Sequence, residues 1–137
     1  MKTEIVTKAV LKNDKGEILI MRRSKTAPRR PLQWDLPGGG VEKTDENYAM
    51  AVSREIKEEA AVDVMHRDLS MVYSHTEMIN GVNVIWLFFT ANVGNVDVKL
   101  SFEHDKYQWL AIKTAINEFE YPRQRDLLQY LYDNKII

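Results

Sequence analysis

Three glutamates stand close together near the middle of the chain, in the stretch REIKEEAAVDV at residues 54–64. On an α-helix, Glu58 and Glu59 lie one turn beyond Glu55 and about 60° to either side of it, so all three share one narrow face. Each like-charged pair at this spacing costs roughly 0.2–0.5 kcal/mol when exposed. One interpretation is a solvated acidic surface. The other is a site for Mg²⁺, which prefers carboxylate and phosphate oxygens.

The spacing of this cluster from a preceding glycine loop favours the second interpretation. Gly40 is followed by five residues, then Glu46, then seven residues, then Arg54 and the acidic cluster in register. The pattern resembles the Nudix box, G-x5-E-x7-R-E-U-x-E-E-x-G-U, in which U is bulky and apolar. The resemblance continues in GEILIMRR and WDLPGGG before the box and in EHDKYQW after it, and it is closest to the MutT-like branch.

The resemblance implies an α/β fold, the Nudix-type α/β/α sandwich with a mixed central sheet, with residues 1–137 forming a single Nudix hydrolase domain. It also implies a divalent cofactor, Mg²⁺, with Mn²⁺ as a substitute. Bound Mg²⁺ neutralises phosphate charge and acidifies water. The implied metal ligands are Glu55, Glu58, Glu59, Glu103 and the carbonyl group of Gly39.

The resemblance further implies catalytic roles for these acids and for one arginine. Glu55 is either a third metal ligand or the base that deprotonates the attacking water. Glu103, six residues before Trp109, is the rival base from a separate loop. Arg54 resembles the family arginine that orients a catalytic glutamate, and the alternative for it is an ordinary surface ion pair.

Substrate-binding residues are expected in the strand and loop before the box. Because side chains alternate along a strand, only one of Arg22 and Arg23 faces the site, and the resemblance favours Arg23 as the phosphate ligand. Gly39 and Gly40 are expected to line the diphosphate site, and either can fill the box position because the following KTD loop is one residue longer than usual. Trp34 is a candidate platform for a base, with packing in the core as the alternative.

These features lead us to expect a Mg²⁺-dependent pyrophosphohydrolase that converts nucleoside triphosphates, oxidised or modified ones included, to nucleoside monophosphate and pyrophosphate. One alternative is another nucleoside diphosphate derivative as substrate, such as ADP-ribose, a nucleotide sugar or a dinucleoside polyphosphate. A second is a catalytically silent module that binds nucleotide. A third, a nucleic-acid-binding domain built on the basic segment 22–30, predicts steeply salt-dependent binding without a metal requirement.

Composition and charge limit the partners of the chain. Nineteen Lys and Arg against twenty Asp and Glu give a formal charge of −1, which supplies no global field for nucleic acid or anionic membrane. The absence of cysteine excludes disulfides, thiolate zinc sites and a cysteine nucleophile. The N-terminal stretch is interrupted by charge every few residues, which predicts neither a signal peptide nor a membrane span. We therefore expect a cytoplasmic monomer or homodimer whose partner is a nucleotide, with no nucleic acid or membrane.

Period and turn signals predict the elements that position these residues. Runs 4–11 and 17–23, separated by NDKG, predict a β-hairpin. Apolar residues at helical spacing predict a helix over 45–60, with Thr44 or Asp45 as its N-cap. Extended segments at 62–78 and 82–93 flank the hairpin signal Asn80-Gly81, a further strand includes 108–112, and Pro122 opens a C-terminal helix.

One position departs from the box. Ala61 replaces the glycine that ends the helix in the family, and alanine enters a left-handed conformation only with strain. We therefore expect the helix to continue one residue further or to end through another residue such as Asp63. Neither outcome displaces the acidic ligands.

Overall fold

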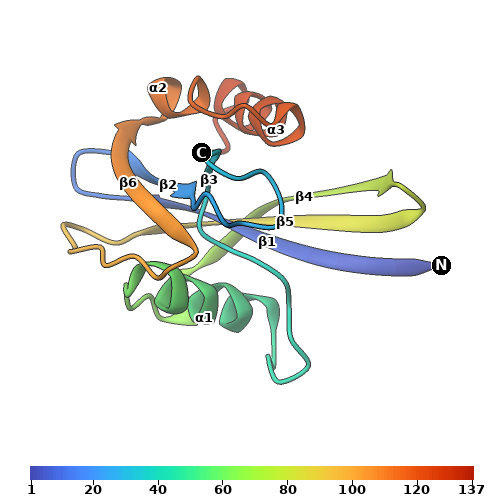
Figure 1. The fold of residues 1–137 in the computed structure, drawn as a ribbon. Helices are drawn as coiled ribbons and strands as arrows, with labels where there is room; N and C mark the ends of the chain where they lie inside the picture. Colours follow the sequence, from blue (N-terminus) through green and yellow to red (C-terminus); the bar gives the residue numbers. More distant parts are fainter.

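The computed structural model describes all residues 1–137 and shows a twisted central sheet between helices (Figure 1). In chain order its elements are β1 (Lys2–Lys12), β2 (Glu17–Arg23), β3 (Trp34–Asp35), α1 (Tyr48–Ala60), the 3-10 helix η1 (His66–Asp68), β4 (Ser70–Ile79), β5 (Val82–Asn92), β6 (His104–Ala111), α2 (Ile112–Ile116) and α3 (Pro122–Asp133). One helix, α1, covers one face of the sheet, and α2 and α3 cover the other. The expected α/β/α sandwich is confirmed.

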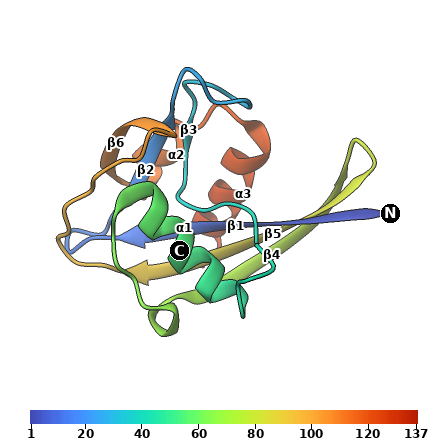
Figure 2. The same ribbon diagram turned by 60° about the horizontal axis from the view of Figure 1, so that its bottom comes forward.

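The sheet combines parallel and antiparallel pairs, as expected for a mixed sheet. Its order is β3-β2-β1-β5-β4, and β6 also pairs with β2. The parallel pair is β1 with β5, in register from Lys2 opposite Val82 to Lys12 opposite Asn92. The remaining pairs, β1–β2, β2–β3, β2–β6 and β4–β5, are antiparallel. Figure 2 shows β1, β4 and β5 running together beyond the helices, with the N-terminus at their far end.

Two tight turns confirm the two predicted hairpins. Asn80 and Gly81 both have positive φ, 49° and 79°, as a two-residue hairpin turn between β4 and β5 requires. In the first hairpin, the Asn13 side chain accepts hydrogen bonds from the backbone N–H groups of Lys15 and Glu17. Such local bonds explain why Asn and Gly were reliable turn signals.

The core has one cluster on each face of the sheet, because the side chains of β5 alternate between them. Leu87 and Phe89 pack toward α1 with Val52 and Ile56. Trp86 and Phe88 pack on the other side with the C-terminal helix residues, including Leu128. A helix with a stripe of apolar residues is therefore needed on each face, and α1 and α3 supply it.

Some local expectations were wrong. Residues 62–69 do not extend β4; they run as a connection that contains η1 and buries Val62 and Val64 against the core below α1. The short helix α2 was not predicted, because five residues carry too little periodicity to signal a helix. None of the helices combines the length and apolar composition that crossing a bilayer requires.

Candidate active site

Helix α1 starts three residues later than predicted and ends at the position that departs from the box. Asn47, not Thr44 or Asp45, is its N-cap, and the side-chain oxygen of Asn47 accepts from the Met50 N–H at 2.8 Å. At the other end, Ala61 itself adopts the left-handed conformation, with φ 56° and ψ 31°. The expected continuation past Ala61 is therefore wrong. Val62 is buried immediately afterwards, so the chain must turn into the core at Ala61.

The glycine loop before α1 is held close against β1. Thr7 donates from its backbone N–H at 2.8 Å and from its hydroxyl group at 3.0 Å to the carbonyl oxygen of Gly39. A cation would have to compete with both bonds for the oxygen that we expected to meet the metal. Gly38 has a φ of 139°, and a Cβ there would lie 2.1 Å from the Thr7 carbonyl oxygen. Only glycine fits so close an approach.

Glu59 is the buried member of the acidic cluster. Its Oε1 atom accepts from the Gly38 N–H at 2.8 Å, and its Oε2 atom lies 3.8 Å from Nε2 of His104. Burial raises the pKa of Glu59 to about 8, although the Gly38 hydrogen bond and the charge of Lys8 act in the opposite direction. Burial also lowers the pKa of His104 to about 4, so its imidazole supplies no positive charge at neutral pH.

Glu55 lies against the glycine loop, because a Cβ added at Gly39 would stand 2.8–2.9 Å from its carboxyl group. Burial raises the pKa of Glu55, the guanidinium of Arg54 offsets this in part, and the charges of Glu58 and Glu103 raise it further. The fold thus brings Glu103, from the loop before β6, into the electrostatic field of the acids on α1. Glu58 and Glu103 are themselves exposed.

Arg54 links the helix to the loop before it. Its guanidinium forms two parallel bonds of 3.0 Å with Asp45 and also donates to Glu55 at 3.1 Å and to Glu58 at 3.3 Å. Its Nη2 atom donates to the Gly40 carbonyl oxygen at 3.2 Å. The hydrogen bond with Asp45 is the largest cause of a raised Arg54 pKa. Arg54 therefore holds Glu55 from the side and is more than a surface ion pair.

The ion pair with Asp45 was missed in the sequence. The box pattern drew attention to Glu46, which is exposed, whereas the neighbouring Asp45 is drawn in toward Arg54. The path of the loop 41–47 thus brings the aspartate, not the glutamate, to the guanidinium. An acidic residue one position from the box glutamate was the available signal.

Arg23 lies beside the loop that carries Glu103, and its role as a phosphate ligand stays a prediction. It lines a cavity of about 90 Å³ together with Glu103 and His104, and the Ser24 N–H donates to the Glu103 carbonyl oxygen at 3.0 Å. The neighbouring Arg22 points away and forms two 2.8 Å bonds with Asp105 at the surface. Trp34 is half-buried and packs against the core below α3, so its role as a base platform stays a prediction.

Two larger hollows run along β1. One, of about 640 Å³, lies between the start of β1 and the loop residues Gly40 to Lys43. The other, of about 590 Å³, is lined on the opposite side by Arg29, Arg30, Trp86 and Tyr121 among others. Glu4 and Val6 border both hollows. The hollow next to the glycine loop and the cavity lined by aromatic and basic side chains therefore both border this part of β1.

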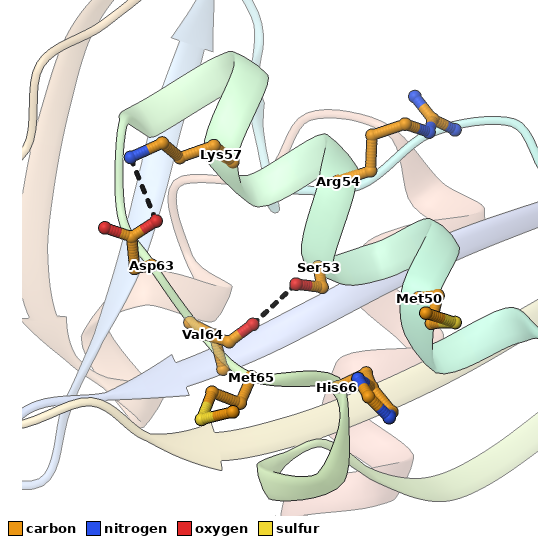
Figure 3. Close-up of a pocket in the computed structure, with 8 residues that line it drawn as sticks. All are labelled: Met50, Ser53, Arg54, Lys57, Asp63, Val64, Met65 and His66. Carbon is orange, nitrogen blue, oxygen red and sulfur yellow. Dashed lines mark hydrogen bonds and ion pairs between the residues drawn. The ribbon is translucent and has the colours of Figure 1, made fainter.

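A further depression, of about 420 Å³, lies on the outer side of α1 and contains none of the clustered acids (Figure 3). Ser53 donates to the Val64 carbonyl oxygen there, and Lys57 pairs with Asp63 at 2.9 Å. Figure 3 shows the Arg54 guanidinium turned away from these contacts. These contacts tie α1 to the segment after it and point to a structural role for this face.

The acidic residues fit a hard divalent cation by their chemistry. No group of three or more His, Cys, Asp or Glu side chains stands in ligating geometry, and Glu58 is engaged with Arg54. The carboxylates nevertheless share one field, and the burial of Glu59 without a close cationic partner leaves the region short of positive charge. The ligand roles of Glu55, Glu58, Glu59 and Glu103 stay predictions.

Comparison with known proteins agrees with this arrangement. The NUDIX domain family matches residues 2–131. The chain belongs to the Nudix family. A MutT protein of Methanosarcina mazei Go1, known from a crystal structure, aligns with a TM-score of 0.84 and 29% identity over 98% of this chain and 96% of that one.

Two curated relatives match over part of their length. An uncharacterised Nudix hydrolase of Listeria innocua is 31% identical over 72% of this chain and 57% of its own length. An RNA pyrophosphohydrolase of Acidiphilium cryptum is 45% identical over 37% of this chain and 30% of its own length. The matched region thus spans little more than half of the first relative and less than a third of the second.

One buried group in this Nudix domain was not predicted at all. Asp35, in the WDLPGGG stretch, is 1% exposed and pairs with Lys8 of β1 at 2.9 Å. The signal was present, since an aspartate between Trp34 and Leu36 and a lysine inside the apolar run of β1 are both charged residues at positions that bury.

Proposed function

We propose that the chain is a Mg²⁺-dependent pyrophosphohydrolase that cleaves nucleoside triphosphates, oxidised or modified ones included, to a nucleoside monophosphate and pyrophosphate. The observation that carries the proposal is the buried Glu59 carboxyl beside the glycine loop, on the same helix as Glu55 and Glu58 and without a close cationic partner. A divalent cation bound there supplies positive charge to the phosphates and acidifies water.

The residues of the chain have distinct tasks in this reaction. Glu58, Glu59 and Glu103 would hold the cation, and Glu55 would accept the proton of the attacking water. The water oxygen forms a bond to the β-phosphorus, the bond from that phosphorus to the α,β-bridging oxygen breaks, and the monophosphate leaves with the bridging oxygen. Arg54, 3.1 Å from Glu55, fixes the direction of the accepting carboxylate.

In this proposal the substrate would lie along the two hollows that border β1. The phosphates would lie by the glycine loop, within reach of Arg23, and the nucleoside would enter the cavity lined by Trp86 and Tyr121. An apolar slot with a few polar groups is the usual form of a nucleotide site. Arg29 and Arg30 at its rim favour an anionic ligand over a neutral one.

A substrate panel with Mg²⁺ tests the proposal. It comprises normal and oxidised nucleoside triphosphates, ADP-ribose, a nucleotide sugar, a dinucleoside polyphosphate and a 5′-triphosphorylated RNA. We expect monophosphate and pyrophosphate from the triphosphates, with ¹⁸O from labelled water in the pyrophosphate. Label in the monophosphate would place the attack at the α-phosphorus, and faster cleavage of another substrate would replace the proposed class. No cleavage of any of them would favour a silent nucleotide-binding module.

The base is identified by comparing Glu55→Gln with Glu103→Gln across pH at saturating metal. The variant that lacks the base should lose the rising acidic limb of kcat, whereas loss of a ligand should mainly weaken metal affinity. The carboxylates share one field, so the limb reports coupled groups and the comparison between variants carries the result. A Glu55→Gln enzyme that keeps the limb, beside a Glu103→Gln enzyme that lacks it, would assign the base to Glu103.

A further inference from the structure

Asp35 is a buried carboxylate outside the acidic cluster, and it receives an unusual number of partners. Its Oδ1 atom accepts from Lys8 Nζ at 2.9 Å, from the Leu36 N–H at 2.8 Å and from Gln124 Nε2 at 2.7 Å. Its Oδ2 atom lies 3.2 Å from Arg23 Nη1 and 3.5 Å from Arg30 Nη2. One carboxylate therefore joins β1, the loop 24–33 and α3.

The charges around Asp35 are unequal. Burial by itself raises the pKa of Asp35, but the charges of Lys8 and Arg30 and the hydrogen bonds from Lys8 and Gln124 outweigh it, and the pKa lies well below its usual range. Asp35 is therefore ionised at neutral pH. Lys8, Arg23 and Arg30 together carry more positive charge than it neutralises. Such a surplus suits an anionic ligand.

The two arginines on Asp35 line different cavities. Arg23 borders the one that contains Glu103 and His104. Arg30 borders the one that contains Trp86 and Tyr121, and its guanidinium stacks 4.3 Å from the centre of the Tyr121 ring. Other residues of the loop between β2 and β3 also divide between the two cavities, with Ser24, Thr26, Ala27 and Pro28 lining the first and Arg29 the second.

This loop is held in a strained conformation. Arg30 and Leu32, neither of them glycine, have φ values of 46° and 62°. The Arg23 side chain also donates to the Arg29 carbonyl oxygen at 2.8 Å, so the same arginine holds the loop from inside. Figure 2 shows the loop rising from β2 and β3 toward α3. Strained residues persist where the surroundings fix them, and they gather at ligand-binding segments.

We infer that Asp35 is a positioning residue that holds Arg23 toward the phosphate side and Arg30 toward the nucleoside side, so that the loop 24–33 presents both to one substrate. The inference rests on the proposed function for the identity of that substrate. Asp35 touches neither the acidic cluster's metal-binding oxygens nor the reacting atoms, and it acts through the two arginines. Substrate affinity and discrimination between bases are the properties that it sets.

The test compares Asp35→Asn with Asp105→Asn. Both changes remove one carboxylate that pairs with an arginine of β2, but Asp105 holds only Arg22 at the surface. For Asp35→Asn we expect KM for the triphosphate to rise at least about 10-fold with kcat within about 3-fold, as for loss of binding common to ground and transition states. The preference among bases, measured as the ratio of kcat/KM values, should also narrow. Asp105→Asn should leave both unchanged.

Two measurements do not depend on turnover. Inorganic tripolyphosphate has no nucleoside, so its protection of the chain against thermal unfolding reports the phosphate side alone, and Asp35→Asn should weaken it. Trypsin can cut the loop after Lys25 and Arg29. Cleavage at these two sites should accelerate in Asp35→Asn, while cleavage at lysines elsewhere stays at the wild-type rate. General destabilisation would raise cleavage at all sites together.

Should Asp35→Asn fail to fold, Asp35→Glu keeps the charge among the three cations and displaces the carboxylate by one methylene. It should raise KM at least about 3-fold and expose the loop to trypsin, because positioning depends on geometry as well as charge. The inference is overturned if either Asp35 variant matches Asp105→Asn in KM, base preference and loop cleavage. If the wild type cleaves no triphosphate, the proposed function fails, and the trypsin and tripolyphosphate measurements still test Asp35.

Discussion

Glu59 and Asp35 are both carboxylates with 5% or less of the side chain exposed, yet their surroundings treat them in opposite ways. Burial raises the pKa of Glu59 to about 8, because the hydrogen bond from Gly38 and the charge of Lys8 offset it only in part, and the neighbouring His104 is neutral. Asp35 faces Lys8, Arg23 and Arg30, and its pKa falls well below the usual range. Burial opposes the charged form at both sites, and only at Asp35 do the neighbouring charges and hydrogen bonds outweigh it.

This difference between Glu59 and Asp35 indicates which buried carboxylates find their partners within the fold. The Asp35 cluster is complete within the fold, because every oxygen has a donor and the carboxylate is ionised without a ligand. The acidic face of α1 has Arg54, which is shared among Glu42, Asp45, Glu55 and Glu58. A divalent cation on that face and a polyphosphate beside the arginines would balance the two regions together.

The largest expected effect is on stability, at Asp35. Replacing Asp35 with Asn leaves the buried Lys8 and the half-buried Arg23 and Arg30 without a countercharge. Breaking a buried pair such as Lys8–Asp35 lowers the free energy of unfolding by about 3 kcal/mol. Urea denaturation measures the change. Asp105→Asn, whose ion pair is exposed to solvent, should change the unfolding free energy far less. Equal losses in the two variants would remove the distinction between a completed buried site and a surface pair.

For the acidic face, Glu59→Gln should reduce kcat by at least about 10²-fold, because a lost ligand charge weakens the transition state by several kcal/mol. The same variant should melt at a slightly higher temperature than the wild type without metal, since a buried acid is replaced by a neutral amide. Calorimetry measures the expected rise in metal-free Tm, and steady-state assays measure the expected fall in kcat. Near wild-type kcat at saturating Mg²⁺ would exclude Glu59 as a ligand, and a clear fall in metal-free Tm would make its role structural.

The two carboxylates should also respond oppositely to pH. The pKa of Glu59 is raised to about 8, so its contribution to the free energy of unfolding is full below the ordinary pKa of 4.5. That contribution is lost as the pH rises through 8. Unfolding of metal-free protein should therefore become easier between about pH 5 and pH 9, and less so in Glu59→Gln. The pKa of Asp35 is lowered instead, so its contribution to the free energy of unfolding is full above the ordinary pKa of 3.8. That contribution is lost only as the pH falls below this value. A flat profile in wild type would show that Glu59 is not destabilised by burial.

The smallest expected effect is at the end of α1. Ala61 has a φ of 56°, so Ala61→Gly should raise the free energy of unfolding by about 1 kcal/mol by relieving a left-handed alanine. Activity should stay at the wild-type level, because the acids lie before the turn. Thermal melts and kcat measure both. A large gain in kcat would mean that the alanine displaces the ligands.

Local patterns were enough to predict much of the fold, whereas the acidic residues of the candidate site came from the family resemblance and their roles stay predictions. The helical repeat ends with Ala60, and the Asn80-Gly81 turn closes its hairpin, because both depend on neighbours in the chain. The Asp35 cluster was not predictable in this way, since Lys8 and Gln124 meet Asp35 only after the sheet and α3 have packed. Arg54 pairs with Asp45 and not with Glu46 because of the path of the loop before α1, and hydrophobic periodicity does not predict the path of a loop.

Cation binding by the acidic face is tested most directly by titrating Mn²⁺ into the metal-free protein and measuring free ion by electron paramagnetic resonance. We expect one site in the wild type, weakened at least about 10-fold in Glu59→Gln because a ligand charge is lost. Asp35→Asn should retain the wild-type affinity, since Asp35 is already satisfied by Lys8 and the arginines. Equal Mn²⁺ affinity in the wild type and Glu59→Gln would contradict the assignment of the acidic face as the metal site.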